Sequence, residues 1–224
     1  MNILVIAAHA DDEVLGCGGT LAKYKDLGAK VNVAVLADGV SSRYADNTKY
    51  SDDLRMRNNA SREANKILGV DKVLLGDFPD NRMDSLDLLD IVQHVEDLLN
   101  EFKPDLIFTH YSNDLNIDHR IVNQAVCTAC RPQNNSSVKS LLFFEVPSST
   151  EWQINSQEVF SPNYFVDVSN YMSKKIKALE SYSMEMRDWP HPRSIKGATY
   201  LAKWRGATVG VDSAEAFVVG RIIK

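Results

Sequence analysis

Cysteines and basic residues are both scarce in this sequence, and each shortage restricts what the protein can be. The chain of 224 residues has three cysteines, an odd number without an evident disulfide framework, which fits a reducing cytoplasm. Lysine and arginine together number 25 against 30 aspartates and glutamates, for a formal net charge of -5. A nucleic-acid partner is therefore not expected, because binding to phosphates needs a basic surplus that displaces counterions.

Long apolar runs are missing as well. No uninterrupted apolar stretch could span a bilayer, so no transmembrane segment is predicted. The apolar residues 2–8 have no basic residue before them and run directly into carboxylates, unlike a signal peptide. We interpret them as a buried first strand, and the expected location is cytoplasmic.

The first 130 residues alternate strand and helix patterns. Strands are expected at residues 2–8, 31–37, 72–75 and 105–109, and helices at 13–27, 52–68, 85–101 and 119–130. Strands that alternate with helices make βαβ units, whose right-handed crossovers give a twisted parallel sheet.

The remainder of the chain has a looser pattern. Further strands are expected at 140–146 and 163–168 and a helix at 171–187, whereas the residues beyond have no clear assignment. Because the sequence has no internal repeat or linker, we predict one α/β domain over residues 1–224. Its expected architecture is a Rossmann-like three-layer sandwich with a mostly parallel sheet and an irregular C-terminal extension.

Two polar clusters follow expected strands. Residues 9–13 (HADDE) stand where the first strand ends, and residues 110–119 follow the fourth strand. In open α/β sheets ligands bind outside the carboxyl ends of the strands, so both clusters are expected to converge on one rim of the sheet.

The clusters contain the ligand types of a catalytic metal centre. Zinc takes imidazole nitrogen and carboxylate oxygen, and a catalytic site keeps one position open for water. His9 and Asp12 can supply two ligands, and His119 a third, with Asp118 as a candidate to support a ligand. Asp11 would then stand beside the metal, where a carboxylate can take a proton from water. The alternative for the acids is charge that stabilises a helix N-terminus, which needs one carboxylate and no histidine.

The glycines of residues 16–19 (GCGG) allow a different interpretation, a phosphate-binding turn. The match to a dinucleotide fingerprint is poor, because the acidic cluster lies between strand and glycines and would repel a pyrophosphate. We interpret these glycines as positions where the helix packs closely on the sheet.

Together these residues resemble the LmbE-like (PIG-L) family of zinc-dependent N-deacetylases. That family opens with Ala-His-Pro-Asp-Asp-Glu and a following Gly-Gly, and later carries His-x-Asp-His. Here the first motif stands as residues 8–13 with Gly18-Gly19, and the second as residues 116–119 (NIDH). The similarity continues through residues 57–69 and 76–77, and more weakly through residues 191–194, so the resemblance covers most of the chain.

The resemblance implies a role for each matching residue. It implies a metal, zinc or another divalent transition metal, on His9, Asp12 and His119, with Asp11 as general base. Arg57 and Asp77 match positions that hold the hydroxyls of the sugar in relatives.

Two departures from the family pattern affect the expected site. Ala10 replaces a proline, at the expense of turn rigidity. Asn116 replaces a histidine that in relatives pairs with the aspartate, here Asp118, to assist the oxyanion or leaving group. We expect Asp11 to move the proton both ways and His191 to serve the oxyanion, from the same chain or from a neighbouring subunit of a homo-oligomer. The alternative for His191 is a rigid exposed turn.

The implied activity is removal of the N-acetyl group from a GlcNAc-like amino sugar, free or conjugated, with a small molecule as the only expected partner besides a second subunit. One alternative is an amidase that acts on a thiol or other small-molecule conjugate. Another is a metal-dependent sugar-nucleotide-binding protein or glycosyltransferase, although histidine ligands disfavour magnesium. A binding protein with an inactive site is a third alternative, against which the intact His9, Asp11, Asp12 and His119 argue.

Overall fold

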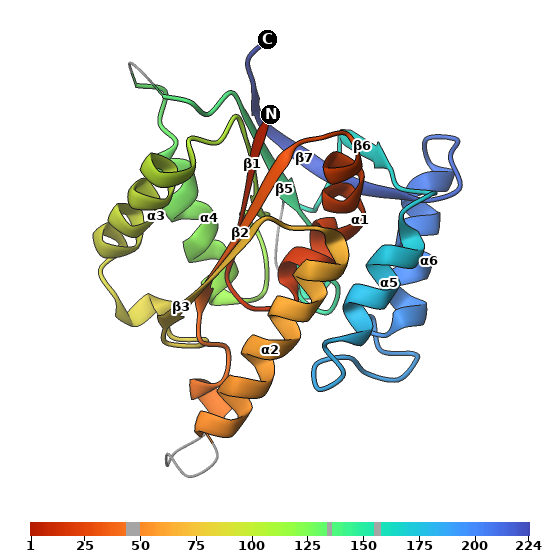
Figure 1. Cartoon of the computed structure of the whole chain (residues 1–224), viewed down its shortest axis with the longest axis horizontal. Coiled ribbons are helices and arrows are strands. Elements are labelled where there is room, and N and C mark those ends of the chain that lie inside the picture. The colour runs from red at the N-terminus through yellow and green to blue at the C-terminus, as the bar shows by residue number, and fades with distance from the viewer. Residues whose placement is uncertain (44–49, 134–135, 155–157) are drawn as a thin grey trace.

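The computed structural model describes residues 1–43, 50–133, 136–154 and 158–224. Within these residues, seven strands form a single sheet in the order β3-β2-β1-β4-β5-β7-β6 (Figure 1). The strands are β1 (Asn2–Ala7), β2 (Lys30–Ala37), β3 (Lys72–Phe78), β4 (Leu106–His110), β5 (Ser140–Phe144), β6 (Tyr164–Asp167) and β7 (Ala214–Ile222). The helices are α1 (Asp12–Asp26), α2 (Tyr50–Leu68), α3 (Leu88–Phe102), α4 (Ile117–Ala129), α5 (Met172–Glu180) and α6 (Ile195–Ala207).

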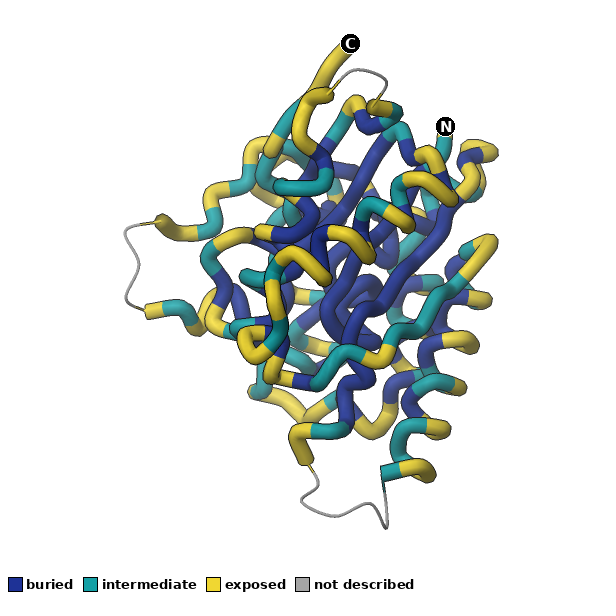
Figure 2. Tube along the Cα trace, turned by 90° about the vertical axis from the view of Figure 1, so that its left-hand side faces the viewer, coloured by how far each residue is buried: buried dark blue, intermediate teal, exposed yellow. Residues whose placement is uncertain are grey.

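The helices cover both faces of the sheet, as predicted for a three-layer sandwich. Ile3 and Val5 of β1 point to a core shared with α1, α2, α5 and α6. Leu4 and Ile6 point to the opposite core, shared with α3 and α4 (Figure 1). Figure 2 shows the central strands as a buried band between partly exposed helices. This burial on both faces explains why β1 is an uninterrupted apolar run.

The sheet is parallel except at β7. The strand pairs β1–β2, β1–β4, β2–β3 and β4–β5 are parallel, whereas β7 pairs antiparallel with both β5 and β6. The mostly parallel sheet is thereby confirmed, and it directs the carboxyl ends of β1, β2, β3 and β4 to one rim.

The C-terminal region is more regular than the sequence predicted. Instead of an irregular extension, it forms α6 and β7, and β7 lies inside the sheet between β5 and β6. Glu215 interrupts the apolar pattern of β7, although its side chain is buried. The helix predicted at 171–187 ends at Glu180, and the chain then continues without regular structure to residue 194.

Helix α1 bends at Cys17, whose φ of −144° is not helical. The carboxylate of Glu215 accepts hydrogen bonds from the backbone N–H groups of Gly19 (2.9 Å) and Thr20 (2.6 Å), just after the bend. Lys175 of α5 donates to the same carboxylate at 2.6 Å. A Cβ atom on Gly16 would lie 2.4 Å from the Phe144 side chain, which confirms that this glycine allows close packing on the sheet.

No helix in the described part of the chain combines the length and the apolar character needed to cross a membrane.

Candidate metal and active site

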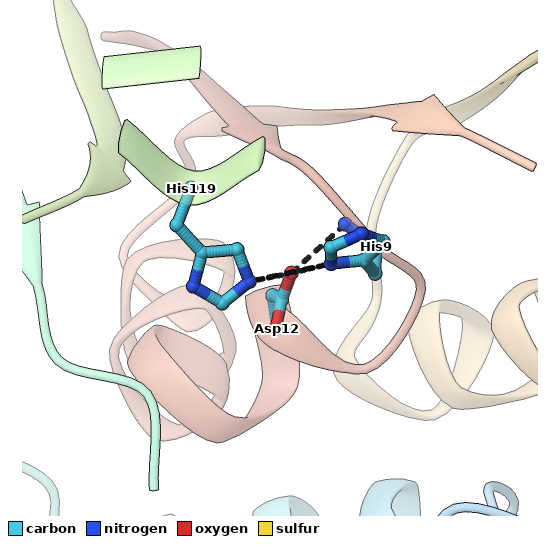
Figure 3. A group of neighbouring side chains, drawn as sticks. All are labelled: His9, Asp12 and His119. Atoms are coloured by element: carbon cyan, nitrogen blue, oxygen red, sulfur yellow. Dashed lines mark hydrogen bonds and ion pairs between the residues drawn. The ribbon is translucent and has the colours of Figure 1, made fainter. Parts of the chain in front are cut away.

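Three side chains from two strand-end turns form a compact group of potential metal ligands (Figure 3). His9 follows β1, Asp12 begins α1, and His119 lies in the first turn of α4. His9 Nδ1 lies 3.3 Å from His119 Nε2 and 3.3 Å from Asp12 Oδ2. His119 Nε2 lies 3.2 Å from Asp12 Oδ2. The three ligand atoms therefore form a nearly equilateral triangle.

This triangle has the size that a tetrahedral zinc ion requires. Nitrogen and oxygen ligands about 2.0–2.1 Å from such an ion lie about 3.3–3.4 Å from one another. Two imidazoles and one carboxylate are also the donor types of a catalytic zinc site with one open position. The residues thus fit a divalent metal ion, and His9, Asp12 and His119 are the residues that would hold it.

The far nitrogen of each histidine is fixed by a carboxylate. His9 Nε2 lies 3.1 Å from Asp118 Oδ2. The Asp118 carboxylate also accepts hydrogen bonds from the backbone N–H groups of Asn81 (2.7 Å) and Met83 (3.0 Å). His119 Nδ1 lies 3.1 Å from Asp114 Oδ1. Such carboxylate–histidine pairs orient ligands and raise their basicity. Asp118, which the sequence prediction named, and Asp114, which it did not name, are therefore placed to support the two candidate histidine ligands.

The charges of the group favour binding of a cation. Burial alone would lower the pKa of His119, but the carboxylates of Asp12 and Asp114 raise it to about 9. Burial would raise the pKa of Asp12, but the neighbouring His119 and His110 hold it well below its usual value. A divalent cation can take the place of the protons that the histidines hold, as expected of a metal site.

Asp11 is held beside this group in an unusual backbone conformation. Its φ is 110°, in the region of positive φ that residues other than glycine rarely adopt. Its N–H donates to Glu13 Oε2 at 3.0 Å, and Glu13 is itself buried, accepting from Asn65 (2.8 Å) and Tyr182 (2.6 Å). Burial and the neighbouring Asp12 raise the pKa of Asp11 to about 7. A carboxyl group near this value can both accept and return a proton at neutral pH.

A cavity of about 390 Å³ opens over the metal-binding group, and Asp11 lines it together with His9, Asp12 and His119. Its other walls come from distant segments. They are formed by Gly39, Ser42, Arg43, Arg57, Asp80, Asn81, Asn116, Val146, Ser148, Ser149, Glu185, Arg187 and Arg193. A cavity of this volume, with polar groups directed into it, suits a small-molecule substrate.

Arg57 and Asn116 reach this cavity, but both also have structural roles. Arg57 Nη1 donates to Gly39 O and to Glu185 Oε1, both at 2.8 Å, and Nη2 donates to Ala10 O at 2.9 Å. Asn116 is the N-cap of α4, where its Oδ1 accepts the N–H of Asp118 at 2.8 Å. The amide that replaces the family's histidine is therefore engaged in starting the helix.

Asp77 and His191 are not brought to the cavity in the described structure. Asp77 lies within β3 and is exposed, because this strand extends to Phe78 and not only to residue 75. The acid of this segment that lines the cavity is Asp80, just past the strand end, and its Oδ1 lies 3.3 Å from His9 Nε2. The ring of His191 packs edge-on against Trp152, and its Nδ1 accepts the N–H of Arg193 at 3.1 Å.

Two further residues at the site were missed by the sequence prediction. Arg193 Nη1 lies 3.3 Å from Asp11 Oδ2, so the residue two positions after His191 is the one that reaches the candidate base. His110 is fully buried, stacks on His119 at 3.9 Å between ring centroids, and accepts the N–H of Ala8 at 2.8 Å. The position of His110 at the end of the fourth strand was the signal that could have identified it.

The structure places this protein among the three-layer α/β sandwiches that carry a candidate His–Asp–His metal site at their strand ends. Residues 4–130, more than half of the chain, match the family described as "PIG-L: GlcNAc-PI de-N-acetylase". The chain belongs to this family, which confirms the resemblance seen in its motifs.

Known relatives agree with this assignment. The chain is 32% identical to a protein of Escherichia coli (strain K12) described as the uncharacterized deacetylase YaiS, over 187 residues that cover 81% of this chain and 90% of that protein. It is 27% identical to the diacetylchitobiose deacetylase of Thermococcus kodakarensis, over 219 residues that cover 92% of this chain and 79% of that protein. The chain is accordingly a deacetylase, an enzyme that hydrolyses an amide bond.

The same fold also occurs in a protein whose name describes an activity other than deacetylation. The solved structure of GalB, the 4-carboxy-2-hydroxymuconate hydratase of Pseudomonas putida KT2440, has a TM-score of 0.80 and 21% identity, covering 100% of this chain and 99% of that one. Identity at this level shows the fold alone, and a fold does not determine a reaction. The reaction therefore has to be argued from the site.

Proposed function

We propose that this deacetylase removes the acetyl group from the amide nitrogen of an N-acetylated, GlcNAc-like amino sugar, with zinc held by His9, Asp12 and His119. The observation that carries the proposal is the triangle of ligand atoms at the floor of a polar cavity, with Asp11 beside it. Another divalent transition metal would satisfy the same donors.

Asp11 has the central role in the proposed reaction. When bound, the metal polarises the amide carbonyl and lowers the pKa of water. Asp11 takes the proton of the attacking water and returns it to the nitrogen of the leaving amine. Burial and the neighbouring Asp12 raise its pKa, which makes it a better acceptor for the proton than an exposed aspartate.

The other residues of the site orient these groups. Asp118 and Asp114 fix the imidazole rings of His9 and His119 through their far nitrogens. Arg57 and Asp80 line the cavity and are our candidates for contacts with sugar hydroxyls, Asp80 in place of Asp77. The proposal takes residues 1–224 as one domain, without a nucleic-acid partner. The cytoplasmic location, the possible homo-oligomer and a role of His191 stay predictions.

The sugar substrate is supported by the relatives and by the lining of the cavity. The Thermococcus kodakarensis relative is a diacetylchitobiose deacetylase by name, and it aligns with most of this chain. Arginine, carboxylate, amide and hydroxyl side chains predominate around the cavity, as recognition of several hydroxyl groups requires.

Acetate release by the purified chain tests this proposal. The protein is stripped of metal, reloaded with zinc, and supplied with N-acetylglucosamine, diacetylchitobiose and an N-acetylated amide without a sugar ring. We expect zinc-dependent release from the sugars and a much lower kcat/KM for the plain amide. A preference for the plain amide would instead favour an amidase for other conjugates, and turnover without any metal would contradict the proposed chemistry.

A further inference from the structure

Arg193 places a positive charge beside the candidate base. It lies on the segment between α5 and α6, and its side chain lines the cavity. Its Nη1 donates to Asp11 Oδ2 at 3.3 Å, and its Nε donates to Ser148 Oγ at 3.0 Å. Within the described residues, Nη2 donates to no protein acceptor. One side of the guanidinium group is therefore held by the protein, and the other is available to a ligand in the cavity.

The backbone on both sides of Arg193 is fixed by hydrogen bonds. Its N–H donates to His191 Nδ1 at 3.1 Å, and its carbonyl accepts the N–H of Arg187 at 3.1 Å. The next residue, Ser194, is the N-cap of α6, where its Oγ accepts the N–H of Gly197 at 2.9 Å. The side chain of Arg193 thus leaves a well-anchored turn, as expected of a preorganised donor.

Other polar groups of the cavity are already engaged with the protein. Arg57 and Arg43 share the carboxylate of Glu185, at 2.8 Å from each. The amide of Asn116 caps α4 and donates to Asn81 Oδ1 at 2.8 Å. Four arginines line the cavity, and among the described residues Arg193 is the one that forms an ion pair with Asp11.

The proposed reaction moves negative charge from Asp11 to the substrate. Asp11 takes a proton from the attacking water, so its carboxylate becomes neutral and attracts Arg193 less. In the same step the water oxygen forms a bond to the acetamide carbon, and an electron pair of the C=O bond moves to the carbonyl oxygen. One anion disappears beside Arg193 while an oxyanion appears on the substrate. When the C–N bond then breaks, the C=O bond re-forms in acetate and the proton passes to the amine nitrogen.

We propose that Arg193 is a further catalytic residue, whose guanidinium group turns from Asp11 to the oxyanion of the tetrahedral intermediate. The inference rests on the proposed function, because this oxyanion forms only from an amide held beside Asp11. A cation binds an oxyanion more strongly than the neutral carbonyl from which it forms, so the contact lowers the barrier more than it tightens substrate binding. Arg193 then fills the role that the sequence predicts for His191.

The Arg193→Met variant of the zinc-loaded full chain tests the inference. On the N-acetylated sugar that the unmodified protein hydrolyses fastest, we expect kcat to fall by about 10²–10³-fold, the usual effect of losing one oxyanion donor. KM and zinc content should change little. Arg193→Lys keeps the charge without the planar fork and should lose less. The control Arg62→Met, which removes an exposed arginine of α2 outside the cavity, should retain full kcat.

A transition-state analogue distinguishes this catalytic role from a structural one. Glucosamine that carries a methylphosphonyl group in place of acetyl has a tetrahedral, negatively charged centre where the planar carbonyl would be. In Arg193→Met its Kd should rise by about the factor by which kcat/KM falls, since both report the same contact. The Kd of glucosamine itself, which lacks that centre, should stay nearly the same. Unchanged affinity for the analogue, or a normal kcat, would overturn the inference.

The two measurements also separate this inference from the proposed function. If the unmodified protein releases no acetate from any sugar but binds the analogue in an Arg193-dependent way, the proposed function fails and the contact of Arg193 with the anionic centre stands. Acetate release that Arg193→Met leaves unchanged would do the reverse.

Discussion

Two walls of the cavity differ in how the chain builds them. The metal wall, residues 9–13 and 110–119, consists of two turns that follow adjacent parallel strands, β1 and β4. The C-terminal wall, residues 145–150 and 181–194, is assembled from segments that have little regular structure. In the metal wall the three candidate ligands and Asp11 are buried, and carboxylates or backbone groups fix the ligands. In the C-terminal wall, arginines reach inward with donors still free.

This difference indicates a division of work between reaction and selection. Buried, hydrogen-bonded groups keep the geometry that a metal and a base require. Irregular segments change more easily without harm to the sheet, so they suit the recognition of particular substrates. Substitutions in the metal wall should therefore affect every substrate alike, and those in the C-terminal wall, apart from Arg193 at the candidate base, should discriminate.

The largest effect is expected from loss of a ligand in the metal wall. His119→Ala should weaken zinc binding by more than about 100-fold, because even changes behind the ligands cost about 10–100-fold. Asp114→Asn, which leaves all three ligands in place, should fall within that smaller range. Zinc content after dialysis and competition with a chelator measure both. Full zinc occupancy in His119→Ala would remove this histidine from the site.

Asp11→Asn should retain zinc and the fold but lose about 10²–10⁴-fold in kcat, the usual contribution of a general base. The loss should be the same for all sugar substrates, because Asp11 belongs to the metal wall. Near-normal turnover, measured at equal zinc content, would show that another group moves the proton.

Glu13 should act through Asp11, whose strained backbone it holds. We expect Glu13→Ala to lower kcat by about 10²-fold, since small displacements of a catalytic group have such effects. In the Asp11→Asn background the same substitution should cost little more, which a double-mutant cycle measures. Tyr182→Phe removes another hydrogen bond of Glu13 and serves as the control. Losses that multiply in the double mutant would point to general damage to the fold.

Lys175→Met should affect stability and not chemistry. It leaves the buried carboxylate of Glu215 without its partner, which costs about 3–5 kcal/mol of unfolding free energy. Lys174→Met, at the neighbouring exposed pair with Asp26, should cost less than about 1 kcal/mol. Urea unfolding of both variants compares them. Similar midpoints would mean that the buried pair contributes little beyond its packing.

The smallest effect is expected at His191. The sequence predicts an oxyanion role, whose loss would lower kcat by about 10²–10³-fold. Since the ring packs on Trp152 outside the cavity, we expect His191→Ala to change kcat by no more than about 2–3-fold. Steady-state kinetics at matched protein concentrations distinguishes these two expected losses of kcat. A large loss that depends on protein concentration would indicate that His191 reaches the site of a neighbouring subunit.

The sandwich and the metal-binding group were predictable because local patterns indicate the strands, the helices and the residues that follow each strand. Strand, turn and helix start lie next to one another around His9 and Asp12, and His119 follows the fourth predicted strand, whose end lies at the same rim. Asp77 was assigned from its match to the family pattern, whereas the structure has Asp77 within β3, which continues to Phe78, and brings Asp80 to the cavity. A short motif match does not establish where a strand ends, and the strand end decides which side chain reaches the rim.

The C-terminal wall could not be predicted for a different reason. Arg193 and Glu185 reach the site only because α5 packs beside α1 and α2, and α6 packs beside α5 and β7. Strand β7 was difficult to recognise because Glu215 interrupts its apolar pattern. The buried charge of Glu215 is explained only by its partners in the folded protein, Lys175 and the backbone of α1 after its bend. Such pairings depend on the tertiary structure and leave no local pattern.

The position of β7 also has a consequence for how the chain matures during synthesis. β5 and β6 are made before β7 but contact each other only through it. Until β7 leaves the ribosome, one edge of β5 therefore has no strand to pair with, and an open edge invites pairing with other chains. Glu215 arrives with the same strand, so the second half of α1 also waits for its carboxylate. The sheet that carries the turn at residues 9–13 is thus completed only after residues 214–222 have been synthesised.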